Sequence, residues 1–305
     1  MKILVSVICC IMVFVTCMVY HEEIVNFFID TYTDVTSEAS TLKNNKYALK
    51  RDYKFIQLTD SFSPESKQDI INIYYTVLNS GMKEFTFYCP TSYKTCIDDV
   101  NYISNNKELL SHINNFVPVY NSFQYIDTNF NNLGKVTIHI TKSAYSEEHI
   151  SIIEEKVNEI MKEIDTSKKV EEQIKQVHDY IINNTKYDTK RSDDKLNVYQ
   201  SDTAYGALIE HYAICGGYTD SMKIFLDRLN IPNYKVSTEN HVWNLVYVND
   251  KWLHLDLTWD DPVVLEDTDK NILDYDYFLI TTEELEALKT NQHIFNKEVY
   301  VEACE

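Results

Sequence analysis

Apolar residues along the chain repeat with two different periods. In one set of segments they recur three and four positions apart, which is the spacing of a helix with one buried face. These segments are 70–78, 150–164, 170–181 and 218–229. A second set consists of short runs of β-branched and aromatic residues, which predict strands. These runs are 54–58, 84–89, 123–125, 135–140, 241–248 and 252–257.

Short polar segments set the ends of several of these elements. Ser63 and Pro64 supply a cap and a first-turn proline for the first helix, and Gly81 is placed to end it. The tetrapeptide 131–134 (Asn-Asn-Leu-Gly) predicts a turn between two strands.

The elements group into two predicted domains. Residues 52–164 read as a small α/β domain without recognisable chemistry. The polar triplet 165–167 interrupts the helical stripe, so we place the boundary there and assign residues 165–305 to the second domain. His178 lies beside the apolar stripe of the next helix, and we expect it to be a structural residue that is hydrogen-bonded near the core.

The first twenty residues depart from the pattern of the rest. The run 3–20 contains no charged side chain, and a helix crosses a bilayer with about 17–25 apolar residues. Lys2 precedes the run and acidic residues follow it, which places the N-terminus inside and the remainder outside. We expect residues 1–20 to be a membrane anchor or signal segment and 21–51 a juxtamembrane spacer. A cleaved signal peptide, which would make the protein secreted, is the alternative, although no small-x-small site follows convincingly.

Composition and charge argue against several other classes of function. The 28 Lys and Arg against 47 Asp and Glu give a net charge of −19, a field that repels phosphate backbones, so we do not expect nucleic-acid binding. The seven Cys include no C-x-x-C pair and give no support to a structural zinc site. Cys89 and Cys96 could close a disulfide in an oxidising compartment. A calcium loop starting at Asp267 is rejected because Ile272 replaces the required Gly and Phe278 the terminal Glu. No metal or cofactor is expected.

Cys215 differs from the other cysteines because a helix with a buried face follows it. Its position at the helix N-terminus places it where unpaired backbone N–H groups stabilise negative charge, and the thiolate is the nucleophilic form of cysteine. Gly216 and Gly217 carry no side chains, which would let a substrate carbonyl approach these N–H groups. We therefore interpret Cys215 as a candidate nucleophile.

A base and an acid follow on the last two predicted strands. If Asn249-Asp250 is the two-residue turn between them, Asp256 lies opposite Trp243, and His241 shares their face because it is two residues from Trp243. His241 and Asp256 then become diagonal neighbours about 7–8 Å apart at the backbone, within reach of a His–carboxylate hydrogen bond. A nucleophile, a base and an orienting acid are what thiol catalysis requires, so these two residues complete a predicted triad with Cys215.

Other titratable residues nearby compete for these roles. His254 lies on the Asp256 face but opposes Leu245, further from His241, so we expect it to be a structural imidazole. Asp260 and Asp261 precede a proline and are expected to cap a turn.

Three motifs occur in an order that resembles the core of the transglutaminase-like superfamily. They are Ala-Ile-Cys-Gly-Gly-Tyr at 213–218, His-Val-Trp-Asn at 241–244 and Trp-Leu-His-Leu-Asp-Leu-Thr-Trp-Asp-Asp-Pro at 252–262. Segments 178–188 and 204–208 also resemble that family, and the resemblance covers about residues 165–262. Val242 stands where the family commonly has Ala, and Gly216 fills a variable position.

The resemblance implies an α+β fold: a papain-like transglutaminase core, preceded here by the small α/β domain and the N-terminal helix. It also implies thioester chemistry in which Cys215 attacks a carbonyl, His241 transfers protons and Asp256 orients the imidazole. Tyr187 and Tyr205 are candidates for a second oxyanion donor. The residues expected to support the site are Gly216, Gly217, Tyr218, Trp243 and Asn244.

The expected function is that of a thiol enzyme acting on amide bonds of proteins or peptides. Hydrolysis by a peptidase or amidase and acyl transfer from protein glutamine differ only in whether water or an amine resolves the thioester. The alternative is a non-catalytic surface module for binding or scaffolding on the same fold. Loss of a triad residue would favour that alternative, and all three residues are present.

Overall fold

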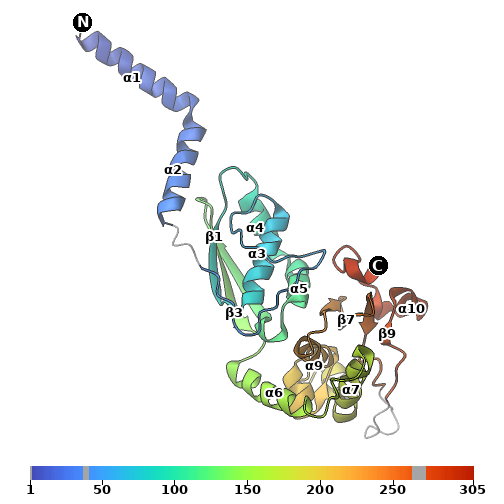
Figure 1. The fold of residues 1–305 in the computed structure, drawn as a ribbon. Coiled ribbons are helices and arrows are strands. Elements are labelled where there is room, and N and C mark those ends of the chain that lie inside the picture. The colour runs from blue at the N-terminus through green and yellow to red at the C-terminus, as the bar shows by residue number, and fades with distance from the viewer. Residues whose placement is uncertain (1, 37–40, 263–272) are drawn as a thin grey trace.

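The computed structural model describes residues 2–36, 41–262 and 273–305; for residues 2–10 and 29–36 it describes the backbone only. Two N-terminal helices, α1 (Lys2–Val19) and α2 (His21–Thr36), project from a body that contains two antiparallel sheets (Figure 1). The calcium-like segment 267–271 lies outside the described residues.

The first sheet has three strands in the order β1-β3-β2. Its elements are β1 (Glu84–Tyr88), β2 (Phe123–Phe130) and β3 (Lys135–Ser143), with helices α3 (Lys67–Ser80), α4 (Cys96–Asn105) and α5 (Lys107–Phe116). The apolar sides of these helices join the sheet in one hydrophobic cluster. The predicted turn at 131–134 is confirmed between β2 and β3, and its Gly134 has a φ of +85°, a conformation that favours glycine.

Two predictions for the start of this half are wrong. Lys54–Leu58 is not a strand, because Tyr53 and Ile56 exchange backbone hydrogen bonds of 2.8 and 3.2 Å and close a tight turn that buries both side chains. The first helix is capped by Ser66 and not by Ser63, since the Ser66 hydroxyl accepts from the backbone N–H of Asp69 at 3.2 Å.

The second half is built around a four-stranded antiparallel sheet in the order β6-β7-β8-β9. These strands are β6 (Asn233–Ser237), β7 (Val242–Val248), β8 (Lys251–Leu255) and β9 (Phe278–Ile280). The helices are α6 (Glu147–Ile160), α7 (Val170–Asn184), α8 (Thr189–Ser192), α9 (Cys215–Arg228) and α10 (Thr282–Ala287). Two short parallel strands, β4 (Lys186–Tyr187) and β5 (Tyr212–Ala213), lead to the start of α9.

Hydrophobic side chains cover both faces of the second sheet. On one face Val246 and Val248 belong to the cluster that includes the apolar residues of α6, α7 and α9. On the other face Tyr234 and Trp243 join the cluster of the first half, where the Tyr234 ring lies 4.6 Å from that of Phe116 on α5. The sheet is therefore a central layer whose packing joins the two halves, and the predicted boundary near residue 165 stays a prediction.

The N-terminal arm carries an exposed apolar surface. In the described part of α1 the large apolar side chains, including Phe14 and Met18, are more than half exposed. Among the described residues no single helix meets the length and hydropathy of a membrane span; Ile11–Val19 and His21–Phe28 meet them only as a pair, bent by 76°.

The end of the predicted spacer is part of the body. The backbone N–H of Asn45 donates to Ser80 at 2.9 Å, and the Arg51 guanidinium forms an ion pair of 2.7 Å with Asp227 on α9. Segment 45–51 therefore connects the first half to the helix that begins at Cys215.

Cys89 and Cys96 form a disulfide, as the sequence allowed. Both residues are buried in the first cluster. Replacing both with Ala is expected to lower the free energy of unfolding by about 2–3 kcal/mol, because the bridge restricts a short loop of the unfolded chain. Urea denaturation of the chain in mild detergent measures this change. Cys304→Ala removes an exposed free thiol and should leave the free energy of unfolding unchanged. If it lowers this free energy as much as the Cys89/Cys96 double replacement does, the loss does not come from the disulfide.

Candidate active site

Cys215 is the first residue of α9, as predicted. The preceding residue, Ile214, has an extended backbone; its N–H donates to Ser201 at 2.8 Å, and its carbonyl accepts from Gly217 and Tyr218. The thiol is half-buried, whereas the other described free cysteines, Cys17 and Cys304, are exposed. The start of α9 thus presents a partly accessible thiol at the positive end of the helix dipole.

Gly216 and Gly217 pack against the backbone of residues 201–203, a contact that the sequence did not predict. A Cβ on Gly216 would lie 2.7 Å from the carbonyl oxygen of Asp202, and a Cβ on Gly217 would lie 2.5 Å from that of Ser201. Their lack of side chains makes room for the chain's own backbone, and the approach of a substrate carbonyl at these residues stays a prediction.

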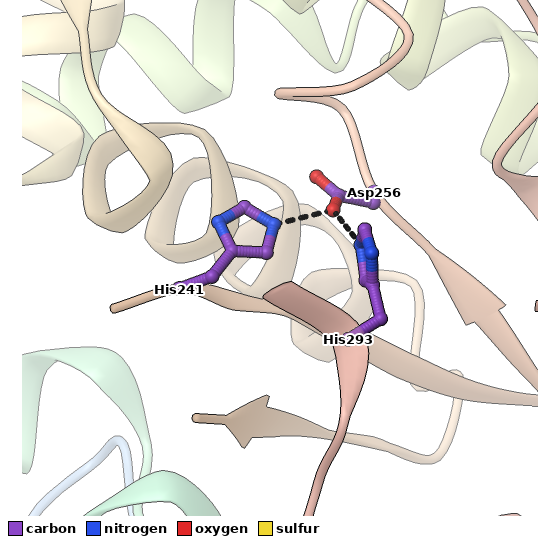
Figure 2. A group of neighbouring side chains, drawn as sticks. All are labelled: His241, Asp256 and His293. Carbon is purple, nitrogen blue, oxygen red and sulfur yellow. Dashed lines mark hydrogen bonds and ion pairs between the residues drawn. The ribbon is translucent and has the colours of Figure 1, made fainter. Parts of the chain in front are cut away.

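The hairpin register that the turn predicts is confirmed. Val248 pairs with Lys251 and Asn244 with Leu255, which continues to Trp243 opposite Asp256. The predicted hydrogen bond is present as well: His241 Nε2 lies 2.5 Å from Asp256 Oδ2, with both side chains buried (Figure 2).

Electrostatics favour a charged imidazole at this site. Burial acts to lower the pKa of His241, but the Asp256 carboxylate and then the Cys215 side chain outweigh it and raise the pKa to about 10. Burial likewise acts to raise the pKa of Asp256, yet His241 and, to a smaller degree, His293 hold it well below its usual range. His241 is therefore an imidazolium at neutral pH, with Nε2–H on Asp256 and the thiol of Cys215 close enough to interact with it.

His293 is a site residue that sequence reasoning missed. Its Nε2 lies 2.9 Å from Asp256 Oδ2, the same oxygen that bonds His241 (Figure 2). Its Nδ1 lies 2.5 Å from Thr290 Oγ1. It follows Asp256 by 37 residues in a polar segment without periodicity, so no local pattern could have placed it here.

His241, Asp256 and His293 also offer three ligand atoms within 4.8 Å of one another. A cation bound at about 2.0–2.2 Å to two ligands holds them further apart than the 2.5 Å between His241 Nε2 and Asp256 Oδ2. The spacing is that of a hydrogen bond, so the cluster is better described as two imidazoles bonded to one carboxylate.

Trp243 supports His241 through His254. The indole stacks on the His241 ring at 5.5 Å and donates its N–H to His254 Nδ1 at 2.9 Å. His254 Nε2 bonds Thr282 Oγ1 at 2.9 Å. Burial lowers the pKa of His254 to about 3, so the ring is neutral and Nδ1 is free to accept. The structural role predicted for His254 is confirmed by these bonds.

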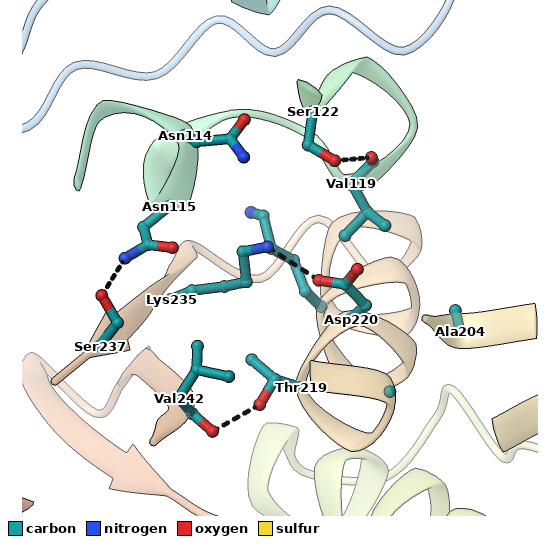
Figure 3. Close-up of polar contacts among 12 residues, drawn as sticks. Asn114, Asn115, Val119, Ser122, Ala204, Thr219, Asp220, Lys235, Ser237 and Val242 are labelled. Atoms are coloured by element: carbon teal, nitrogen blue, oxygen red, sulfur yellow. Dashed lines mark hydrogen bonds and ion pairs between the residues drawn. The ribbon is translucent and has the colours of Figure 1, made fainter. Parts of the chain in front are cut away.

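Asn244 is not at the triad but fastens the sheet to α9. Its amide donates to the Thr219 carbonyl at 3.1 Å. The Thr219 hydroxyl donates to the Val242 carbonyl at 2.9 Å (Figure 3). At the next residue of α9, Asp220 forms a buried ion pair of 2.8 Å with Lys235 of β6 (Figure 3). These contacts fix the helix that carries Cys215 against the strands that carry His241.

Asp260 and Asp261 are not turn caps but interior acceptors, which corrects the sequence interpretation. Asp260 Oδ2 bonds His178 Nε2 at 3.1 Å, and its Oδ1 accepts from the Tyr277 backbone at 2.8 Å. Asp261 accepts from the Tyr218 hydroxyl, and burial raises the pKa of Asp261 to about 6. His178 is fully buried, and its predicted structural role is confirmed.

Of the two tyrosines considered as oxyanion donors, the structure brings Tyr187 toward the thiol. Tyr187 in β4 pairs with Ala213, two residues before Cys215. Burial raises the pKa of Tyr187, and Cys215 contributes to the same rise through its charge. Tyr205 instead stacks on His149 of α6 at 4.4 Å.

The buried His254 predicts a pH dependence of stability. Unfolded His254 protonates near its ordinary pKa of 6.5, whereas the folded ring stays neutral down to about pH 3. Its contribution is therefore complete above pH 6.5 and is lost as the pH falls, by up to about 1.4 kcal/mol per pH unit. His254→Asn keeps an acceptor for Trp243 but does not titrate, so its urea-unfolding free energy should fall less steeply between pH 6.5 and 4.5. Equal slopes for the two proteins would refute this.

The crowding at Gly217 reverses the usual effect of alanine in a helix. Ala normally stabilises a helix relative to Gly by up to about 1 kcal/mol. In Gly217→Ala the new Cβ would meet the Ser201 carbonyl at 2.5 Å, so we expect a loss of about 1–3 kcal/mol and slower modification of Cys215. Urea denaturation measures the change in the free energy of unfolding. If the variant is more stable than the wild type, the prediction is wrong, because the 201–203 backbone then moves aside without cost.

The segment that carries the site resembles a known family. Residues 156–257 match the family model of the transglutaminase-like superfamily, a range that contains Cys215, His241 and Asp256. No curated protein matches the chain.

Two solved structures show weak similarity. A crystal structure described as that of "a TGase" is 14% identical over 62% of this chain and 64% of its own, with a TM-score of 0.34. A "putative cysteine protease" from Cytophaga hutchinsonii is 15% identical over 44% of this chain and 61% of its own, with a TM-score of 0.28. The chain thus spans less than two thirds of either protein. The family match shows that residues 156–257 of this chain form a transglutaminase-like domain.

Proposed function

We propose that this protein is a thiol enzyme that acts on amide bonds of proteins or peptides through a thioester on Cys215. The observation that carries the proposal is the buried hydrogen bond of 2.5 Å between His241 and Asp256, on an imidazole that also interacts with Cys215 at the start of α9. Cys215, His241 and Asp256 are the proposed catalytic residues.

The chemistry follows from the charges at the site. The Cys215 thiolate attacks the amide carbonyl carbon, and the imidazolium of His241 gives its proton to the departing amine as the C–N bond breaks. Water or a second amine then attacks the thioester and gives a proton to the neutral imidazole, which regenerates the thiolate–imidazolium pair. Asp256 keeps the imidazole oriented and stabilises its positive charge in both steps.

The developing oxyanion needs donors close to the thiol. The backbone N–H of Cys215, in the first turn of α9, has no backbone acceptor among the described residues and is aligned with the helix dipole. We assign the second donor to the Tyr187 hydroxyl, on the strand that pairs with the segment leading to Cys215. Family membership of the domain supports a protein or peptide substrate; water as the acceptor would make the protein a peptidase or amidase, and an amine would make it an acyltransferase.

The N-terminal segment 3–20 is proposed to attach the protein to a membrane with the catalytic domain extracytoplasmic. Support comes from its uncharged sequence, from the exposed apolar side chains of α1, and from the Cys89–Cys96 disulfide, a bond typical of oxidising compartments. Cleavage after this segment would make the protein secreted.

Alkylation with iodoacetamide tests the proposed thiol pair. At pH 6, Cys215 should react about 10- to 100-fold faster than the exposed Cys304, because only a thiolate attacks and an ordinary thiol with a pKa of about 8.5 is almost fully protonated there. His241→Ala should abolish this difference. Peptide mass spectrometry after timed labelling quantifies each cysteine in one sample.

His149→Ala is the matched control, since it removes an imidazole that stacks on Tyr205 and not on a proposed catalytic residue. A labelling rate for Cys215 equal to that for Cys304 would sink the enzyme proposal and leave a binding module. If the thiol is activated, a glutamine peptide with and without methylamine separates cleavage, deamidation and amine transfer by product mass.

A further inference from the structure

We propose that His293 is a positioning residue of the triad, which holds the Asp256 carboxylate in place for His241. The inference rests on the proposed thiol function and adds a residue to it. His293 lies outside residues 156–257, the range that matches the transglutaminase-like family, so the family-matched core does not contain this part of the site.

Four hydrogen bonds hold the carboxylate of Asp256, and His293 donates one of them. Oδ1 accepts from the backbone N–H groups of Thr258 at 3.0 Å and Trp259 at 3.4 Å. Oδ2 accepts from His241 at 2.5 Å and from His293 at 2.9 Å. Each oxygen therefore has two donors, which occupy its acceptor sites. The carboxylate is 2% exposed, so water cannot readily replace a lost donor, and removal of His293 leaves Oδ2 with His241 alone.

The direction of the His293–Asp256 bond is fixed by the carboxylate. An ionised carboxylate only accepts, so Nε2 of His293 must carry a proton. The other ring nitrogen, Nδ1, lies 2.5 Å from the Thr290 hydroxyl, which anchors the ring on its far side. Thr290, His293, Asp256 and His241 thus form one chain of hydrogen bonds, in which both imidazoles donate to Asp256.

Aromatic rings hold the His293 imidazole in this orientation. Tyr277 stacks on it with centroids 5.2 Å apart, and Trp243 and Trp259 lie edge-on at 4.9 and 5.3 Å. Trp243 also stacks on His241. The same indole therefore orients both imidazoles that bond Asp256, and the donor of His293 is restricted to the carboxylate.

Two substitutions separate hydrogen bonding from packing. His293→Phe keeps a ring among Tyr277, Trp243 and Trp259 but removes the donor. His293→Gln keeps an N–H group at a similar reach but gives up the ring. If His293 positions Asp256, the Phe variant lets the carboxylate turn away from His241, and the Gln variant largely retains the wild-type arrangement.

The first measurement is the pKa of His241 by NMR titration of the imidazole signals in the full chain. It should fall by at least about one unit in His293→Phe and stay close to wild type in His293→Gln. The rate of Cys215 acylation should fall about 10- to 100-fold in the Phe variant, the scale of a misplaced catalytic group, with little change in KM. His149→Phe, which makes the same replacement beside Tyr205, should change neither quantity.

An unchanged His241 pKa and acylation rate in His293→Phe would overturn the proposal and leave His293 as a packing residue. Equal decreases of the His241 pKa and of the acylation rate in His293→Phe and His293→Gln would also overturn it, because the N–H donor that only the Gln variant keeps would then have no effect. If His293→Phe does not fold, Thr290→Val replaces it: that variant keeps the imidazole, removes the hydroxyl that anchors the ring on its far side, and should lower the His241 pKa in the same direction. The titration measures the pKa of His241 even if Cys215 of the wild type is inert. Failure of the proposed thiol function and failure of the proposed role of His293 therefore give different results.

Discussion

A buried carboxylate that must stay ionised is the constraint on which the site depends. Asp256 lies in the interior at the end of β8, where an isolated charge would be strongly disfavoured. Two imidazoles and two backbone N–H groups donate to it. Burial acts to raise the pKa of Asp256, but His241 and then His293 hold that pKa well below its usual range. The persisting charge in turn raises the pKa of His241, which also interacts with Cys215 on α9, to about 10. Removing one partner of such a buried pair typically costs about 3–5 kcal/mol, so the same bonds contribute to stability and to the charge state of the site.

The second sheet places these groups accurately because both of its faces are packed. Side chains of α9 cover one face, and those of α5 and the C-terminal segment cover the other. Thr219 and Asn244 connect α9 to β7 through hydrogen bonds, and Lys235 with Asp220 adds a buried ion pair between β6 and α9 (Figure 3). These contacts hold the helix that begins at Cys215 against β7, which begins one residue after His241.

Local sequence rules predicted the parts of the site that depend on local geometry. Asn249 and Asp250 both have positive φ, as a two-residue hairpin turn requires, and this turn fixes the register that brings Asp256 beside His241. The apolar period after Cys215 predicted the helix and its start. The prediction for Asp260 failed because its side chain bonds distant segments, accepting from His178 and Tyr277. The contact of Gly216 and Gly217 with the 201–203 backbone is likewise a pairing of distant segments. No short-range pattern records such pairings.

His293 is the clearest case of a residue that only the tertiary structure identifies. His293 lies beyond β9, the strand that pairs with β8 beside Asp256. Thr282 at the start of α10 then bonds His254, and Tyr300 joins the cluster beneath Trp243. Each of these contacts belongs to a residue beyond the family-matched range, yet each supports a side chain within it. The C-terminal segment therefore completes the polar and aromatic surroundings of Asp256 and Trp243. A fragment that ended at residue 257 would leave Asp256 with His241 alone among its four donors, and Trp243 without the rings of His293 and Phe295.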